Sequence, residues 1–196
     1  MHDICLKIDK SWDGRALPEQ HRATVAFVLS SKELRVAIDA PYYGDAAPSS
    51  PPGSTDRLWE FEVVELFLAG PEESYLELEF GPLGHYLALE CEGIRNAVRT
   101  GQRLDFNAKR VGGRFIGVAV VSRELVALPN GPLRANAYLI HNAPCVPGTG
   151  RCYHAHSPVP GHRPDFHRLD CFVSVSEPQA VIDCLLYFGY PWKPST

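Results

Sequence analysis

The sequence predicts an all-β fold, an antiparallel β-sandwich with one short C-terminal helix. Most of the chain consists of segments with apolar residues at every second position, the period of a strand, and turn residues separate them. Residues 176–189 instead have apolar residues at helical spacing, with Ser176 as a cap and Gly189 as a stop. The chain of 196 residues is 45% hydrophobic and 21% charged, which suits a single domain, 1–196, with a sizeable core.

The first predicted hairpin joins residues 23–30 to residues 34–39 through a short polar turn. Both segments alternate apolar and other residues, as two adjacent strands with one buried face would. Residues 40–57 follow and are rich in Pro, Ser, Ala and Gly. Because prolines cannot donate to a sheet ladder, we expect a surface loop there, and loops of this length are usually functional.

The central part of the chain contains the remaining predicted strands. The turn residues "GPLG" at 81–84 and "VGG" at 111–113 each join two of them as neighbours. These strands are expected at residues 59–68, 75–80, 86–91, 104–109, 114–121 and 133–141. The His- and Pro-rich segment 145–167 that follows is predicted to be irregular.

Charge and cysteine content limit the class of protein. The net charge of −4 gives no basic face, so no nucleic-acid partner is expected. The N-terminus lacks the apolar core of a signal peptide, and no apolar run is long enough for a membrane span. Six scattered cysteines without a secretory signal favour reduced thiols and a cytoplasmic location.

Three glutamates interrupt the predicted strand "WEFEVVELFL" at 59–68. Glu60 and Glu62 share a face that begins polar, and we expect both to be solvated. Glu65 shares its face with phenylalanine and valine, where an unpaired carboxylate is costly, so it needs an ion pair, a metal or a ligand hydroxyl. Glu77 and Glu79 point the same way at a spacing of about 7 Å, as in some glycosidases, but solvated strand residues explain them better.

Several motifs carry a family resemblance. The stretches "LWEFEVVELFL", "SYLELEFGPLGHYLAL", "GIRN" and "PDFHRLDCF", with "WDG" and "APYYGDAAP", resemble an uncharacterised animal family known as a chromosome-four open-reading-frame protein. The central strands are in turn similar to family-nine carbohydrate-binding modules and DOMON-like sandwiches. The resemblance implies an antiparallel β-sandwich with a ligand site at one end.

The resemblance also implies site residues. In the sugar-binding relatives an aromatic plate and a glutamate six residues later share the ligand with an arginine, and the matching positions are Trp59, Glu65 and Arg95, with Asn96 beside the arginine. An indole covers the apolar face of a pyranose, while a carboxylate and a guanidinium hold its hydroxyls. Since six residues of strand span roughly 20 Å, Trp59 must lie in the loop before the strand.

The relatives use a second aromatic plate and a structural calcium site, and neither has a clear match. Tyr42, Tyr43 and Tyr153 are the candidates for the second plate. The leading hypothesis is therefore a non-catalytic module that binds a small carbohydrate-like, polyhydroxylated ligand without a cofactor. Its protein partners are undefined.

Two alternatives come from other classes. His154, His156, Asp165 and His167 could hold a divalent metal such as zinc or calcium in a hydrolase or oxygenase, since His-x-His places both rings on one face of a strand. The same residues could instead hold loops together through hydrogen bonds. A third possibility is an interaction scaffold, because residues 56–92 contain ten acids and one base, an acidic ridge that could dock a basic protein.

Overall fold

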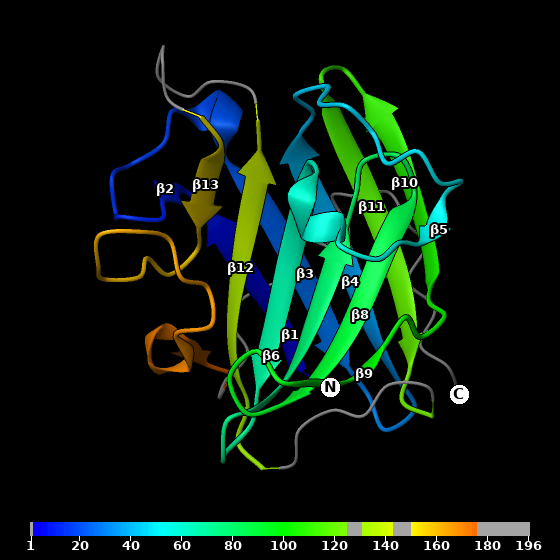
Figure 1. Ribbon diagram of the computed structural model, residues 1–196, viewed down its shortest axis with the longest axis vertical. Coiled ribbons are helices and arrows are strands. Elements are labelled where there is room, and N and C mark those ends of the chain that lie inside the picture. Colours follow the sequence, from blue (N-terminus) through cyan, green and yellow to red (C-terminus); the bar gives the residue numbers. More distant parts are fainter. Residues whose placement is uncertain (1, 125–130, 143–149, 176–196) are drawn as a thin grey trace.

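Two β-sheets pack face to face in the computed structural model, which describes residues 2–124, 131–142 and 150–175 (Figure 1). All strand pairs are antiparallel except the short pair of β5 and β8, which confirms the predicted fold class. The predicted helix at 176–189 lies outside the described residues.

The smaller sheet has five strands in the order β1-β3-β4-β11-β10. Their bounds are β1 His2–Ile8, β3 Ala23–Leu29, β4 Glu33–Pro41, β11 Arg114–Ser122 and β10 Asp105–Val111. Both predicted hairpins, β3–β4 and β10–β11, are present with antiparallel register. The strand at the N-terminus, β1, was not predicted.

The larger sheet has nine strands in the order β2-β13-β12-β6-β7-β8-β5, with β14 beside β12 and β9 beside β8. Their bounds are β2 Lys10–Ser11, β13 Cys152–Ala155, β12 Arg134–His141, β6 Val63–Ala69, β7 Ser74–Phe80, β8 His85–Glu92, β5 Gly53–Ser54, β14 Val173–Ser174 and β9 Ala97–Thr100. Short 3₁₀ helices lie at η1 Glu19–His21, η2 Leu58–Glu60 and η3 Leu169–Cys171. β13 shows that the segment predicted to be irregular contributes a strand.

The interior of the sandwich is apolar on both sheets. From β6, Val64, Leu66 and Leu68 enter it, and each is fully buried. β7 adds alternate residues in the same way, among them Leu76 and Leu78. This core supplies the hydrophobic stabilisation that the strand pattern predicts.

The outer face of the larger sheet is also buried, which is unusual for an antiparallel sheet. Phe166, Leu169 and Phe172, from the segment that runs alongside β12 (orange in Figure 1), belong to a second apolar cluster on that face. The ring of Phe166 stacks on Tyr138 with centroids 3.8 Å apart, and Phe172 meets the edge of Phe67. As a consequence, all seven residues of β6 are buried, including those that point away from the interior.

Glu62 holds the loop at 40–57 against the sheet. Its carboxylate accepts hydrogen bonds from the backbone N–H groups of Tyr43, Gly44 and Asp45, at 2.8, 3.0 and 3.1 Å. The prediction of a solvated side chain is therefore wrong for Glu62, because the loop folds over it. It is right for Glu60, which is exposed and forms an ion pair with Arg57.

Cys152 forms a disulfide bond, so the expectation of reduced thiols is wrong at this position. Cys91 and Cys171 are free thiols. In the described part of the chain, no helix has the length and apolar character that crossing a membrane requires.

We predict that Glu62→Ala lowers the free energy of unfolding by at least about 2 kcal/mol, because it leaves three backbone donors without a charged acceptor. Urea unfolding measures the change. Glu60→Ala is the matched control two residues away and should cost less than about 1 kcal/mol, as surface ion pairs do. Equal losses for the two variants would show that Glu62 does not hold the loop.

Candidate ligand-binding pocket

A cavity of about 490 Å³ lies between the outer face of the larger sheet and the segments that cover it. Its size is within the range of small-molecule sites. Strands of the sheet supply one wall, and η2, the turn between β8 and β9, and residues 164–167 supply the others. The cavity is lined by Trp59, Glu65, Tyr75, Glu77, Leu89, Cys91, Arg95, Ala97, Ile140, Arg151, Tyr153, Pro164, Phe166 and His167.

Three of the four predicted ligand-binding residues line this one cavity: Trp59, Glu65 and Arg95. β6 begins at Val63 rather than at residue 59, and Trp59 lies in η2 before it, which meets the geometric requirement set by the strand length. Asn96 is not among the lining residues. Its amide donates to the carbonyl of Glu92 at 2.7 Å and closes the turn between β8 and β9.

A hydrogen-bond network positions Arg95 at the rim. Its backbone has a left-handed conformation, with φ of 59°, and its N–H donates to the hydroxyl of Tyr75 at 2.9 Å. The guanidinium donates to Asp165 at 2.8 Å, so the partner of Arg95 is Asp165 and not Glu65. The Tyr75 hydroxyl also contacts Nδ1 of His167 at 2.7 Å, which joins the turn to the covering segment.

Three buried carboxylates lie close together, and two of them, Glu65 and Glu77, line the cavity. Glu65 on β6 lies directly opposite Glu79 on β7, and Glu77 is two residues further along β7 on the same face. One carboxylate oxygen from each lies within 4.8 Å of the others. In the described part of the chain, none of the three forms an ion pair, and both carboxylate oxygens of Glu79 lack a hydrogen-bond partner.

Burial dominates the electrostatics of this trio. It raises the pKa of Glu65 to about 8, against the attraction of Arg151. Burial, and after it the charge of Glu65, raises the pKa of Glu77 well above its usual range. The pKa of Glu79 is also raised well above its usual range, first by burial and then by the charges of Glu65 and Glu77. Carboxyl groups with raised pKa values hold protons near neutral pH and can both donate to and accept from hydroxyl groups.

The trio contradicts two expectations from the sequence. Glu77 and Glu79 were predicted to be solvated, but both are buried. η2 contacts β7, and Phe166 and His167 line the same cavity as Glu77. The predicted acidic ridge is not a continuous surface either. Of the ten acids between residues 56 and 92, these five are buried: Glu62, Glu65, Glu77, Glu79 and Glu90.

Two further aromatic rings line the cavity together with Trp59. Tyr153 and Phe166 line the cavity, and their rings meet edge to face with centroids 5.7 Å apart. The other two candidates for a second plate lie elsewhere, because Tyr42 is covered by an arginine and Tyr43 stacks on a histidine. Arg151 donates to the backbone carbonyls of Trp59 and Phe61, which holds η2 at the rim.

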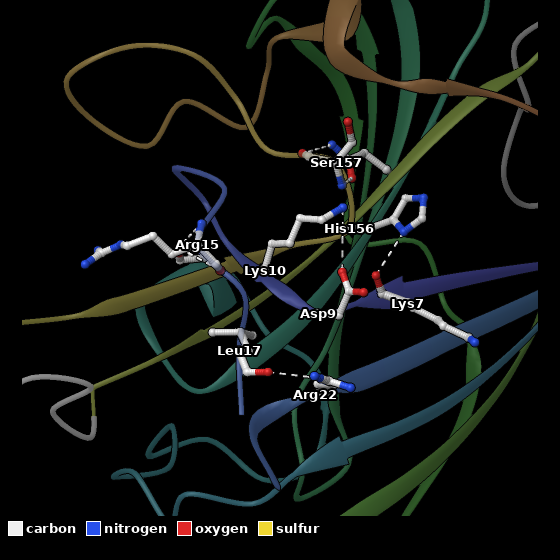
Figure 2. A network of polar contacts seen from close by, with 10 residues as sticks. Lys7, Asp9, Lys10, Arg15, Leu17, Arg22, His156 and Ser157 are labelled. Carbon is white, nitrogen blue, oxygen red and sulfur yellow. Dashed lines mark hydrogen bonds and ion pairs between the residues drawn. The ribbon is translucent and has the colours of Figure 1, made fainter. Parts of the chain in front are cut away.

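The alternative metal-binding set is not gathered at one point. His167 lines the pocket and Asp165 pairs with Arg95, whereas His154 packs against His141 with ring centroids 5.0 Å apart. Figure 2 shows that Nδ1 of His156 contacts the carbonyl of Lys7, at 2.9 Å. In residues 2–124, 131–142 and 150–175, the group of three possible metal ligands that does converge is the glutamate trio.

Sequence reasoning missed Tyr75, Glu77, Arg151 and Phe166 as lining residues. The sequence does contain a signal for Tyr75 and Glu77. The strict alternation of "YLELEF" places them on one face, and a short turn after β6 pairs that face with Glu65. No local signal marks the other two, which reach the pocket through tertiary packing.

The fold and the pocket define the class of protein, which is an antiparallel β-sandwich with a ligand-sized cavity against one sheet. A solved structure of a presumed carbohydrate-binding protein from Bacteroides uniformis shares this fold, with a TM-score of 0.66 at 15% identity over 87% of this chain and 84% of that one. A family-9 carbohydrate-binding module from Caldicellulosiruptor kristjanssonii, solved with cellotriose, has a TM-score of 0.49 at 11% identity, over 91% of this chain and 84% of that one.

Sequence relatives define the family. The chain is 35% identical over 175 residues to the UPF0462 protein C4orf33 homolog of Danio rerio, covering 84% of this chain and 85% of the relative. It is 33% identical over 178 residues to the UPF0462 protein C4orf33 of Homo sapiens, covering 86% and 85%. The chain belongs to the UPF0462 C4orf33 family, which confirms the resemblance. No protein-family model matches it.

We predict that His167 makes the protein sensitive to acid. Burial lowers its pKa to about 4, so between pH 6.5 and 4 the unfolded chain binds a proton that the folded chain does not. The free energy of unfolding should therefore fall with decreasing pH by up to roughly 1.4 kcal/mol per pH unit from this group. His167→Gln should flatten the profile by that amount.

Urea unfolding at several pH values measures the difference between the native protein and the variant. His162→Gln, at an exposed position in the same segment, is the control and should leave the profile unchanged. If the native and His167→Gln profiles run parallel from pH 6.5 to 4, His167 does not remain neutral in the folded protein over this range.

Proposed function

We propose that the protein is a binding module for a small carbohydrate-like, polyhydroxylated ligand, which binds in the cavity that Trp59 lines. The observation that carries the proposal is the convergence of an indole, a buried carboxylate and a guanidinium, from Trp59, Glu65 and Arg95, on one cavity of about 490 Å³. These groups come from three separate segments of the chain, and the fold places them together.

The chemistry of the lining suits an amphipathic sugar ring. Trp59, Tyr153 and Phe166 offer aromatic surface for C–H groups. Arg95 offers charge-assisted hydrogen bonds for hydroxyl groups, and the carboxyl group of Glu65 can both donate to them and accept from them. A few polar groups in an otherwise apolar and aromatic cavity are typical of small-molecule sites.

The guanidinium remains available to a ligand. Its side chain is 57% exposed while it pairs with Asp165, so its remaining N–H groups can donate to a ligand oxygen without breaking that ion pair. The fold shared with the Bacteroides uniformis protein, which is described as a presumed carbohydrate-binding protein, supports the same ligand class.

A calorimetric panel of neutral mono- and oligosaccharides at millimolar concentration tests the proposal. We expect at least one sugar to bind at a single site and to change tryptophan fluorescence, because Trp59 lines the cavity. If no sugar or polyol binds at these concentrations, the proposal is wrong.

For the sugar that binds, Trp59→Ala and Arg95→Ala should each weaken binding at least about tenfold, or roughly 1.4 kcal/mol. Trp59→Phe should retain part of the affinity, since it keeps an aromatic face. Arg99→Ala is the matched control, because Arg99 pairs with Glu90 at similar exposure, 52%, but does not line the cavity. Equal effects at Arg95 and Arg99 would place the ligand elsewhere.

A further inference from the structure

We propose that Glu65, Glu77 and Glu79 bind a hard divalent cation of the size of calcium beside the cavity. The site does not depend on the identity of the organic ligand. Because Glu65 and Glu77 also line the cavity, the open coordination positions of the ion would face the pocket, where water or ligand hydroxyls complete the shell.

The spacing of the carboxylates fits one ion. The three ligand atoms lie within 4.8 Å of one another. Three atoms at such mutual distances all lie within about 2.8 Å of a common centre, close to the calcium–oxygen distance of roughly 2.3–2.6 Å. Small side-chain rotations therefore suffice, and the paired backbones of β6 and β7 need not move.

The second observation is the state of Glu79. This side chain has no exposed surface, and in the described part of the chain neither carboxylate oxygen has a hydrogen bond of ordinary geometry; the backbone N–H of Trp59 is near enough only to oppose the rise of its pKa. Buried polar atoms without partners are rare in native proteins and point to a missing ion or water. Glu79 is directed at the other two carboxylates, the position from which it would complete a cation site.

The composition of the group selects the kind of ion. All three ligands are carboxylate oxygens, which favour calcium, magnesium or manganese over zinc or copper. Arg151 and Arg95 act on Glu65 and Glu77 from a distance but form no ion pair with them, so the negative charge that the trio gains when a cation displaces its protons is left for the cation to compensate. The relaxed coordination geometry of calcium suits ligands fixed by two strands better than the strict octahedron of magnesium.

Calcium titration of protein first treated with EDTA tests the proposal, without any sugar present. We expect one calcium per chain by calorimetry and a concentration-dependent rise in the thermal midpoint. Terbium, a calcium analogue, should give luminescence sensitised by Trp59, which calcium then suppresses. Absence of a saturable calcium, magnesium or manganese site in the native protein would overturn the proposal, since the trio would then hold protons only.

Variants connect the signal to the trio. Glu79→Gln keeps the shape of the side chain and should weaken calcium binding at least tenfold, and Glu77→Gln is a second variant with the same expectation. Glu90→Gln is the matched control, because Glu90 is buried but bonded to Arg99 and Gln102, and it should bind calcium as the native protein does. Unchanged binding by folded Glu79→Gln and Glu77→Gln would overturn the proposal.

The test for calcium binding can fail or succeed independently of the test for sugar binding. Trp59→Ala removes the aromatic plate but none of the three carboxylates, so it should retain calcium binding by calorimetry while losing the sugar. Loss of calcium binding in a folded Trp59→Ala variant would count against a site made by the trio.

Discussion

The burial of three carboxylates on the outer face of the larger sheet is the constraint on which the rest of the structure depends. An acid removed from water without a cationic partner is costly, and three within 4.8 Å of one another increase that cost. The fold does not relieve it with an ion pair to a described residue. What the arrangement provides instead is a group of oxygen atoms beside an open cavity, available to protons, a cation or hydroxyl groups.

The fold tolerates the free-energy cost of burying these carboxylates because the two faces of the larger sheet have different roles. The interior face of β6 and β7 is wholly apolar and supplies the stability. The outer face carries Glu65, Glu77 and Glu79 on the same two strands, whose ladder fixes their spacing. Trp59 lies on the 3₁₀ helix η2 and Arg95 on the turn between β8 and β9. The site thus combines carboxylates on paired strands with an indole and a guanidinium on the segments that border them.

The period-two pattern was sufficient to predict the fold class and both hairpins of the smaller sheet, because it reports which face of a strand is buried. It also identified Glu65 as anomalous among apolar neighbours. Glu62 and Glu79 were misjudged for one reason: the period of a strand does not report what covers its outer face. The backbone of residues 43–45 folds onto Glu62, and η2 lies against β7, the strand of Glu79. The prediction that Trp59 precedes the strand succeeded because it rested on the length of a strand.

The central claim is that these carboxylates serve to bind a cation or ligand, and that they lower the free energy of unfolding of the protein when nothing is bound. Urea unfolding in EDTA at pH 8 tests it directly, comparing the native protein with a variant in which Glu65, Glu77 and Glu79 are all glutamine. The account predicts a higher free energy of unfolding for the variant, since raised carboxyl pKa values mean stability lost as pH rises above about 4.5. A variant less stable than the native protein would show that the acids serve the fold itself.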